Sequence, residues 1–417
     1  MTSFPRILIV GTLPYNPNES SRALDTYFHN WPKENLRMIF SNTNIPMKGH
    51  CGALYQITDY DVLQVFKKKT NKCGRVIEYS DLKENEVINK SDNLTKFKRK
   101  TILRYYARKT LWNKKRWLTK ELIDWVDEFK PEAVYICFSD DYFILDIADY
   151  FLSKYNIPVI AQIGDDYYFK KQSMLLRPYL CKYKKLFNKI MNYDGFGVYI
   201  SEKLSKKYND FFKLQGEPFY LSSSIEREEN SIKNEFNYIG KVALGRDKSL
   251  AILGDILFKV NPEFSVNIYT QDKVSSSLIR YWQKHNCSFK GSVDYRNAIQ
   301  IMNSGSFNIV ASGFRKKDIN ESRYSLSTKV ADSLASSGPI IATGSKGDGA
   351  IDFFSQHDCS ILIDTKCPNI ENISRQIYNR NTLVEKINKA HNVFDNLFIV
   401  EKNRSRFEEN CRKIVYK

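Results

Sequence analysis

The residues from Ser325 to Gly344 carry the chemical pattern with the clearest meaning in this chain. Their sequence, Ser-Leu-Ser-Thr-Lys-Val-Ala-Asp-Ser-Leu-Ala-Ser-Ser-Gly-Pro-Ile-Ile-Ala-Thr-Gly, predicts a polar loop, a helix and a buried strand. Ser327 or Thr328 can cap the helix, whose first backbone N–H groups then face an anion. Asp332 lies one turn further on and can accept hydrogen bonds from ribose hydroxyls. The pattern therefore favours a phosphate beside a ribose, although an ordinary capped helix would look the same.

A group of cations follows the predicted strand from Phe236 to Gly240. Lys241 and Arg246 are five residues apart around a glycine turn, and Lys248 is a competing candidate just beyond them. Cations at the start of a helix oppose the helix dipole unless an anion is bound there. The loop therefore predicts a diphosphate site, with exposed surface cations as the alternative.

Together these segments resemble the donor site of GT-B glycosyltransferases of the retaining, family-four kind, in which a Ser/Thr-Lys-x-x-Glu/Asp-x-Leu-Ala-x-Gly-x-Pro pattern precedes a hydrophobic strand. The resemblance implies that Lys241 and Arg246 hold the donor pyrophosphate, with the two residue types exchanged relative to the family. It also implies that the Ser327 to Lys329 turn supplies N–H donors, that Asp332 holds the ribose, and that a turn with Gly291 and Val293 pairs its backbone with the base.

One part of the family pattern is missing. The donor loop of the family carries two glutamates eight residues apart; the second falls on Asp332 and the first on Tyr324. Glu321 is close to this position but out of register. The group that touches the transferred sugar therefore stays unassigned, and the choice between retention and inversion stays open.

Length and alternation of elements predict two α/β domains. The chain has 417 residues, which exceeds the size of a single ordinary core. The resemblance implies a GT-B architecture, with two doubly wound Rossmann-like domains facing a central cleft. We expect an acceptor-side domain at 1–221, a linker at 222–235, a nucleotide-sugar domain at 236–383, and C-terminal helices at 384–417 that pack back on the first domain. The expected strands are 7–10, 37–40, 133–138, 158–163, 197–200, 236–240, 266–269, 307–310, 339–342 and 360–363.

Polar residues follow several expected strands of the first domain. Gly11 and Thr12 form a turn at the carboxyl edge, where doubly wound sheets bind ligands. Asp165 and Asp166 are the preferred candidates for activating an acceptor hydroxyl, ahead of the Asp140-Asp141 pair. Loop-capping aspartates would look the same. Asp59-Tyr60-Asp61 resembles the metal motif of GT-A enzymes, but it lacks their context, and we interpret it as a chance match.

The formal net charge of +17 is concentrated in two acid-free segments. One runs from Lys96 to Lys120 with eleven Lys or Arg residues, and the other from Lys170 to Lys189 with seven. The first predicts a basic helix lying on an anionic membrane, but RNA or DNA binding or a solvated basic face would use the same charges. The candidate membrane-binding residues are Trp112, Lys114, Lys115, Arg116 and Trp117.

Other classes of protein lack support. Eight cysteines without a Cys-x-x-Cys pair and five dispersed histidines predict neither a metal site nor a disulfide framework. No phosphate loop, nucleophile elbow or membrane-spanning stretch is present in the sequence. The start reads as a buried strand and not as a secretion signal. We expect a cytoplasmic protein, peripheral at the inner face of the plasma membrane, that needs no cofactor besides a nucleotide sugar as co-substrate.

The resemblance implies a metal-independent hexosyl- or other glycosyltransferase of surface polysaccharide synthesis, such as capsule or exopolysaccharide. The donor would be a UDP- or GDP-sugar, and the acceptor a saccharide, plausibly linked to a polyprenyl lipid. Two alternatives remain open. One is a nucleotide-sugar epimerase of GT-B shape, and the other is a nucleic-acid-binding module that uses the basic segments, although nucleic acid is not the partner we favour.

Overall fold

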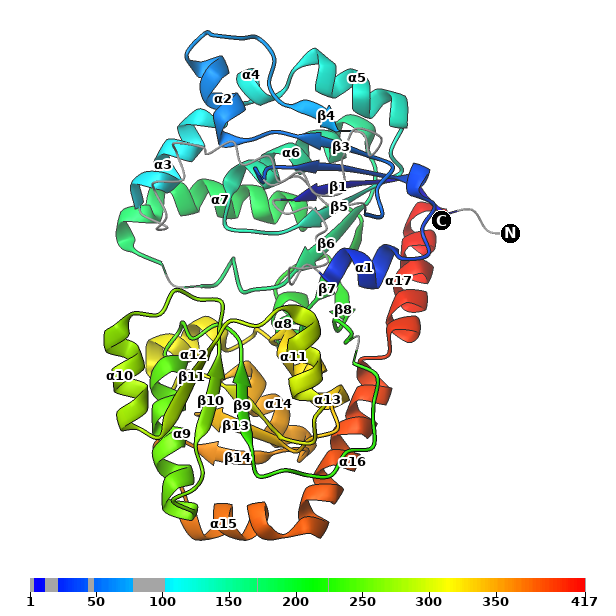
Figure 1. Ribbon diagram of the computed structural model, residues 1–417. Coiled ribbons are helices and arrows are strands. Elements are labelled where there is room, and N and C mark those ends of the chain that lie inside the picture. The colour runs from blue at the N-terminus through cyan, green and yellow to red at the C-terminus, as the bar shows by residue number, and fades with distance from the viewer. Residues whose placement is uncertain are drawn as a thin grey trace. The chain divides into compact units, whose positions relative to one another are not determined.

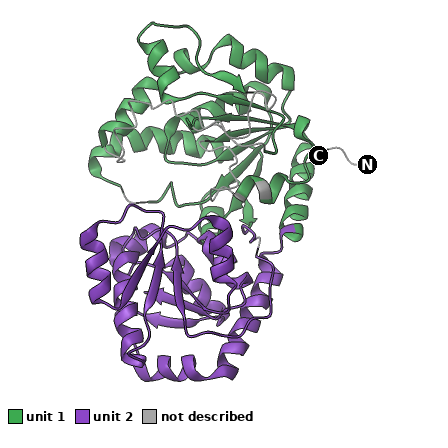
Figure 2. Ribbon diagram, viewed as in Figure 1, with its two compact units in different colours: residues 1–219, 401–417 green, residues 220–400 purple. Residues whose placement is uncertain are grey.

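The computed structural model describes residues 4–11, 22–43, 49–77, 102–170, 172–223 and 225–416. Predicted residues Thr12 and 96–101 lie outside these ranges. The chain divides into two compact units (Figure 2). Unit 1 contains residues 1–219 and 401–417, and unit 2 contains residues 220–400. The division thus falls inside the C-terminal helical tail, whose last helix belongs to unit 1.

Unit 1 is built on an eight-stranded sheet of order β4-β3-β2-β1-β5-β6-β7-β8. Every neighbouring pair is parallel except β3 and β4 (Figure 1). The central strand β1 is buried along its whole length, as its continuous apolar sequence Ile-Leu-Ile-Val requires for a strand covered on both faces. The strands are β1 Ile7–Gly11, β2 Leu36–Phe40, β3 Ala53–Gln56, β4 Arg75–Ile77, β5 Ala133–Cys137, β6 Val159–Ile163, β7 Gly195–Tyr199 and β8 Gly216–Pro218.

Helices cover this sheet, and the last helix of the chain also packs into the core of unit 1. Phe407 of α17 is fully buried, and its ring packs against those of Phe28, Tyr135 and Phe196. The C-terminus therefore completes the core of unit 1. The helices are α1 Arg22–Phe28, η1 Lys33–Asn35, α2 Asp59–Phe66, α3 Ile102–Leu111, α4 Lys114–Trp117, α5 Lys120–Phe129, α6 Tyr142–Tyr155, η4 Met174–Leu176, α7 Arg177–Ile190, α8 Glu202–Asn209 and α17 Val400–Val415.

Unit 2 has a wholly parallel six-stranded sheet of order β11-β10-β9-β12-β13-β14 (Figure 1). Counted within the unit, this is the 3-2-1-4-5-6 order of dinucleotide-binding folds, with the order reversing between β9 and β12. Phe236 of β9 stacks on Phe307 of β12 at that boundary, 4.7 Å between ring centroids. The strands are β9 Phe236–Ile239, β10 Val266–Tyr269, β11 Cys287–Gly291, β12 Phe307–Ala311, β13 Ile340–Gly344 and β14 Ile361–Asp364.

Helices connect the strands of unit 2 in the usual crossover manner, and the segment before β9 lies along the unit. Glu228 N donates to Ser337 Oγ at 3.2 Å, and the Arg227 guanidinium pairs with Asp395 at 2.7 Å. The expected linker is therefore bound to unit 2 through its backbone and the Arg227 side chain. The helices are α9 Arg246–Val260, α10 Ser276–Lys284, α11 Tyr295–Met302, α12 Lys316–Ser322, α13 Thr328–Ala335, α14 Gly349–His357, α15 Ile370–Tyr378 and α16 Arg380–Leu397.

All ten expected strands are present, with bounds shifted by at most a few residues. Sequence reasoning missed β3, β4, β8 and β11. The last two contain glycine, and the residues of β8 and most of β11 are partly exposed, so neither shows the continuous apolar run that marks a buried parallel strand. None of the helices in the described part of the chain is both long and apolar enough to cross a membrane.

Candidate active site

The predicted phosphate-binding residues lie at the carboxyl edge of the unit 2 sheet. Because all six strands are parallel, the loops that follow them meet at this edge. Open α/β sheets bind ligands where the strand order reverses, which here is between β9 and β12. The loop with Lys241 follows β9, and the segment that leads to Ser327 follows β12. Both predicted donor segments therefore flank the position that the topology favours.

The turn between β9 and α9 depends on two glycines. Gly240 has φ +147°, and a Cβ there would lie 1.4 Å from Lys329 Nζ. Gly245 has φ +78°, and a Cβ there would lie 2.4 Å from a carboxylate oxygen of Asp318. A larger residue at either position would be strained and would clash. Gly240 therefore leaves the space in which the Lys329 ammonium group lies.

The side chain of Lys329 extends from α13 back to β9 and adds a third basic group to the two predicted cations. Its Nζ lies 3.4 Å from Tyr238 Oη and 4.6 Å from the centroid of that ring. Burial and the positive charge of Arg246 lower the pKa of Lys329 to about 7, with a smaller contribution from Lys241. The carboxylates of Asp332 and Asp272 act in the opposite direction. Arg246 and Lys241 thus both lie within electrostatic reach of Lys329, and a bound anion would be favourable beside these charges.

Asp272 and Tyr238 hold this loop, and sequence reasoning assigned no role to either. An Asp272 carboxylate oxygen accepts a hydrogen bond from Val242 N at 2.8 Å. Tyr238 Oη donates to the carbonyl oxygen of Lys241. Asp272 could have been identified from its position in the sequence, because it follows β10 at the same edge as Lys241. Arg246 begins α9, and Lys248 lies exposed two residues later.

Helix α13 begins as the sequence predicts. Ser327 is its N-cap and accepts from Lys329 N at 3.4 Å, and Thr328 is the first helical residue. Asp332 is buried, and its carboxylate accepts from Ser223 Oγ at 2.7 Å. The predicted ribose-binding carboxylate is thus held by a hydroxyl from the segment before β9.

Gly291 and Val293 lie at the end of β11, the edge strand of the sheet. Gly291 has φ +88°, with open space where a side chain would lie. The carbonyl oxygen of Val293 accepts from Gln271 Nε2 at 3.4 Å. Base pairing by this turn stays a prediction, and Gln271 is the neighbouring side chain that a base would meet.

Asp318 after β12 and Asp348 after β13 are held in place by neighbouring side chains. The Arg315 guanidinium donates to both oxygens of Asp318, at 2.6 and 3.0 Å. Asp348 caps α14 and accepts from Ser312 Oγ at 2.8 Å. Tyr324 is partly buried and Glu321 exposed.

In unit 1, the two members of the Asp165-Asp166 pair have different surroundings. Asp166 accepts from Lys207 Nζ at 2.8 Å, from Tyr208 Oη at 3.2 Å and from Phe169 N at 3.0 Å. These bonds fasten the loop after β6 to α8, and a catalytic role of either aspartate stays a prediction. Asp165 is exposed and remains the candidate. Gly11 ends β1, with a Cβ position only 3.2 Å from Cys137.

The other acidic pairs of unit 1 are engaged around one arginine. Arg108 Nη1 lies 2.6 Å from Asp141, and Arg108 Nε lies 3.0 Å from Asp59. Tyr105 Oη donates to Asp140 at 2.7 Å. Asp61 forms a capping box with Thr58 at the start of α2, so the Asp59 and Asp61 pair has structural partners. Within the described ranges, no three His, Cys, Asp or Glu side chains are grouped so as to hold a metal ion.

The predicted membrane-binding segment requires a correction. Trp112 and Trp117 are 2% and 0% exposed. Trp112 stacks on Phe143 at 3.7 Å between ring centroids and donates to Asp59, so one face of its ring and its N–H are occupied by protein. Neither ring can reach a lipid headgroup. The segment also breaks into α3 and α4 instead of forming one helix.

Two cations of α4, Arg116 and Lys114, have partners within unit 1. Arg116 donates to the carbonyl oxygens of Thr110 and Leu111 at the end of α3, at 2.6 and 2.9 Å. Lys114 pairs with Asp146 at 3.5 Å, and Lys115 is exposed. Arg116 therefore caps a helix, and reversing its charge would disturb α3.

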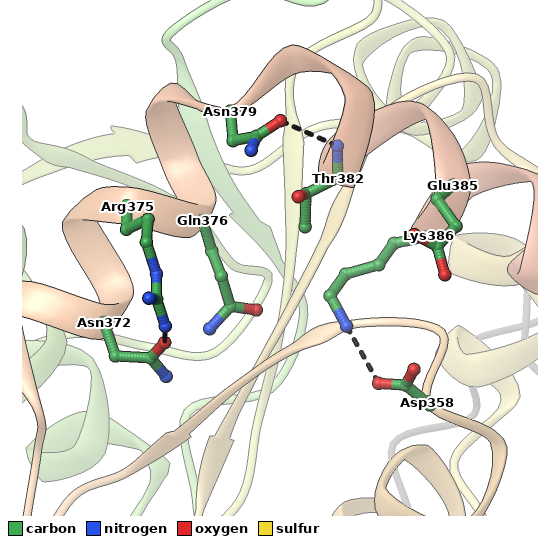
Figure 3. Close-up of a pocket in the computed structure, with 8 residues that line it drawn as sticks. All are labelled: Asp358, Asn372, Arg375, Gln376, Asn379, Thr382, Glu385 and Lys386. Atoms are coloured by element: carbon green, nitrogen blue, oxygen red, sulfur yellow. Dashed lines mark hydrogen bonds and ion pairs between the residues drawn. The ribbon is translucent and has the colours of Figure 1, made fainter.

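A pocket of about 360 Å³ lies elsewhere in unit 2, between the end of α14 and helices α15 and α16 (Figure 3). Lys386 Nζ and Asp358 meet across it at 2.9 Å. Asp358 precedes β14, which places this pocket at the amino edge of the sheet, opposite to the edge with Lys241. The pocket contains none of the predicted site residues. Its lining residues are Asp358, Asn372, Arg375, Gln376, Asn379, Thr382, Glu385 and Lys386.

Sequence comparisons leave the family open, since no family model and no curated protein matches the chain. Solved structures do resemble it. HepE from Anabaena in complex with UDP has a TM-score of 0.62 at 12% identity, covering 98% of this chain and 100% of that one. Sucrose-phosphate synthase from Thermosynechococcus elongatus has 0.61 at 9% identity, covering 98% of each chain. A glycosyltransferase from Rickettsia africae has 0.54 at 11% identity, covering 100% and 99%.

These structural neighbours include GT-B glycosyltransferases. At such low identities the likeness establishes the architecture, and it extends over nearly the full length of both chains. The expected fold class is confirmed: two parallel-sheet α/β units in a single chain, one of them with the 3-2-1-4-5-6 strand order, give this protein the GT-B fold.

Proposed function

We propose that this protein transfers a sugar from a UDP-sugar to a saccharide acceptor. The observation that carries the proposal is that Lys241 and Arg246 follow β9, beside which the strand order of unit 2 reverses, and that both lie within electrostatic reach of Lys329. A diphosphate needs concentrated positive charge, and a nucleoside needs a carboxylate for its ribose. Asp332 lies within electrostatic reach of Lys329 and can supply that carboxylate.

Each residue of this group has a distinct task in the proposed reaction. Negative charge grows on the diphosphate as it leaves the sugar, and preorganised cations stabilise that charge more in the transition state than in the ground state. Lys241 and Arg246 are proposed to act in this way. The N-cap turn at Ser327 and Thr328 would donate backbone N–H groups to the same diphosphate.

The choice of UDP over GDP rests on the structural neighbours. HepE is solved in complex with UDP and with UDP-glucose. The base would lie against the turn at Gly291 and Val293, beside the Gln271 amide. Because side-chain cations meet the charge of the diphosphate in this proposal, added divalent metal would not be required for transfer.

Unit 1 is proposed to bind the acceptor, with Gly11 at its carboxyl edge and Asp165 positioned to accept a proton from the attacking hydroxyl. We further propose that the acceptor is a lipid-linked saccharide of surface polysaccharide synthesis. The support for this step is the acid-free basic surface of α3 and α7, which would favour work at an anionic membrane.

Calorimetric titration with UDP, GDP, ADP and CMP tests the donor site. We expect UDP to bind the wild-type protein and binding to weaken in Arg246→Ala, while the exposed Lys248→Ala serves as a matched control. UDP-sugars would then be incubated with a lipid-linked saccharide, and the product analysed by mass spectrometry. Absence of binding by all four nucleotides would contradict the proposal, and release of a free epimerised donor would identify an epimerase instead.

A further inference from the structure

Three aliphatic side chains stand out on the surface of unit 1. Met174, Leu175 and Leu103 are 84%, 69% and 67% exposed, the highest values among the exposed large hydrophobic residues of the described part of the chain. Leu103 lies on α3, whereas Met174 and Leu175 lie in η4, more than sixty positions later. Exposure of single apolar residues is ordinary, but a group of the most exposed ones is not.

A hydrogen bond brings these residues together. Tyr106 Oη donates to the carbonyl oxygen of Leu175 at 2.9 Å, which fixes η4 against α3. Leu103 is three residues before Tyr106 on the same helix and therefore lies on the same side of α3. The short helix η4 directly precedes α7. Figure 1 shows α3 and α7 next to each other in unit 1. The three aliphatic side chains thus belong to one exposed area.

Cations of α3 and α7 accompany these aliphatic residues. Lys109 of α3 and Lys182 of α7 lie close enough that burial and the charge of Lys182 lower the pKa of Lys109. Lys109 Nζ also lies 6.0 Å from the centroid of the Tyr179 ring on α7. Arg177 begins α7 two residues after Leu175, and neither α3 nor α7 contains an acid.

Two carboxylates that bind residues of α3 are already paired. Asp141 lies 2.6 Å from Arg108 Nη1, and Asp140 accepts from Tyr105. Like charges that approach each other at a surface favour an anionic partner, which relieves their repulsion. The combination of protruding aliphatic chains with surrounding cations is typical of surfaces that insert shallowly into the headgroup region.

We propose that this area docks on an anionic lipid membrane, and we call it the docking face. It replaces the segment with Trp112 and Trp117 as the membrane contact. A single-stranded nucleic acid would need exposed aromatic rings for base stacking, whereas the exposed side chains here are aliphatic. The docking face consists of Leu103, Lys109, Met174, Leu175, Arg177 and Lys182.

The test is sedimentation of the full-length protein with vesicles of phosphatidylcholine alone or mixed with phosphatidylglycerol. We expect binding to the anionic vesicles only, weakened by high salt. Each cation near the surface contributes about fivefold to partitioning, so Arg177→Glu with Lys182→Glu should lower partitioning by at least about tenfold. Met174→Ser with Leu175→Ser should lower it as strongly, although the charge is unchanged.

Matched controls lie on unit 2. Lys259→Glu with Lys284→Glu makes the same change in net charge at exposed positions, and Phe258→Ser removes an apolar side chain that is 43% exposed. We expect both controls to bind vesicles like the wild-type protein. Because vesicle binding needs no donor, UDP affinity measured in parallel separates failure of the docking face from failure of the proposed function.

Three outcomes would overturn the proposal. The wild-type protein could ignore anionic vesicles while it still binds UDP. The unit 2 controls could lose as much vesicle binding as the docking-face variants, which would mean that net charge alone is responsible. Finally, single-stranded oligonucleotides could bind more tightly than vesicles and depend on Arg177 and Lys182 but not on Met174 and Leu175, which would identify a nucleic-acid surface.

Discussion

Lys329 is the residue whose protonation should report donor binding most directly. Burial and the Arg246 charge lower its pKa to about 7, so the ammonium form is only partly populated in the empty site near neutral pH. A diphosphate beside it would raise this pKa. Donor binding should therefore be accompanied by proton uptake at any pH that lies above the pKa of Lys329 in the free protein and below its pKa in the complex.

The first prediction follows from this proton uptake. Affinity for a UDP-sugar should be highest below about pH 7 and should fall as pH rises from about 7 to about 9, because each bound molecule must then bring in a proton. A UDP-sugar is preferred to UDP because the terminal phosphate of UDP titrates near pH 6. Calorimetry in two buffers with different ionisation enthalpies measures the uptake directly.

Two variants sharpen this test. Lys329→Arg keeps its charge over the whole pH range and should abolish the proton uptake if the site accommodates it. Lys329→Met has no titrating group and should also give none, with weaker binding at low pH. Equal proton uptake in the wild-type protein and Lys329→Met would show that another group is responsible.

The second prediction concerns Arg246. Its replacement by alanine should lower the turnover number by about a hundredfold, as is typical for loss of one preorganised electrostatic contact. Lys248→Ala, two residues further along the same helix, should change turnover little. Steady-state transfer from a UDP-sugar checks both, with circular dichroism as the control for folding. An unchanged rate in Arg246→Ala would assign the role to Lys248.

At the scale of elements, Arg108 attaches α3 to the rest of unit 1. Its guanidinium joins Asp59 at the start of α2 and Asp141 at the start of α6, and it lies 4.8 Å from the centroid of the Phe143 ring. Its side chain is only 15% exposed, so these ion pairs are poorly screened by solvent. Burial raises the pKa of Asp141, which opposes ionisation, while Arg108 favours it.

The third prediction is that Arg108→Ala lowers the free energy of unfolding of unit 1 by about 3 kcal/mol, because two partly buried carboxylates lose their cation. Lys115→Ala on the exposed side of α4 should cost less than about 0.5 kcal/mol. Urea denaturation followed by tryptophan fluorescence is suitable, since four of the five tryptophans lie in unit 1. UDP affinity should be unaffected. A loss below about 1 kcal/mol would mean that α3 is held by its apolar contacts.

At the scale of the whole molecule, the two units have separate tasks in the proposed reaction. The cations proposed for the diphosphate belong to unit 2, whereas the docking face and Asp165 belong to unit 1. Transfer requires both, but donor binding requires only the first. Changes in the two units should therefore affect different measurements.

The fourth prediction tests the role of the cations in the complete protein. Because Lys241, Arg246 and Lys329 are proposed to neutralise the diphosphate, transfer should persist in excess EDTA at close to its original rate. The measurement is transfer from a UDP-sugar before and after chelation, with manganese added back as the control. Loss of transfer that manganese restores would mean that the diphosphate needs a metal.

The sequence by itself determined ten of the strands and the edge at which the predicted donor residues lie. The apolar runs of β1, β9, β12 and β13 mark buried parallel strands locally, and the residues after such strands must gather at one edge. Ser327 was recognisable as a cap for a similar reason, because capping involves only the next few residues. These features depend on short stretches of chain.

Only the tertiary structure decided which polar and aromatic side chains remain available for function. The sequence suggested Trp112 as a membrane anchor, but its ring is buried against Phe143, and Asp166 is bonded to Lys207 and Tyr208. Burial lowers the pKa of Lys329, and so does the charge of Arg246, which is remote in sequence. Burial and charge pairing arise from residues that packing brings together across the fold, so no local pattern encodes them.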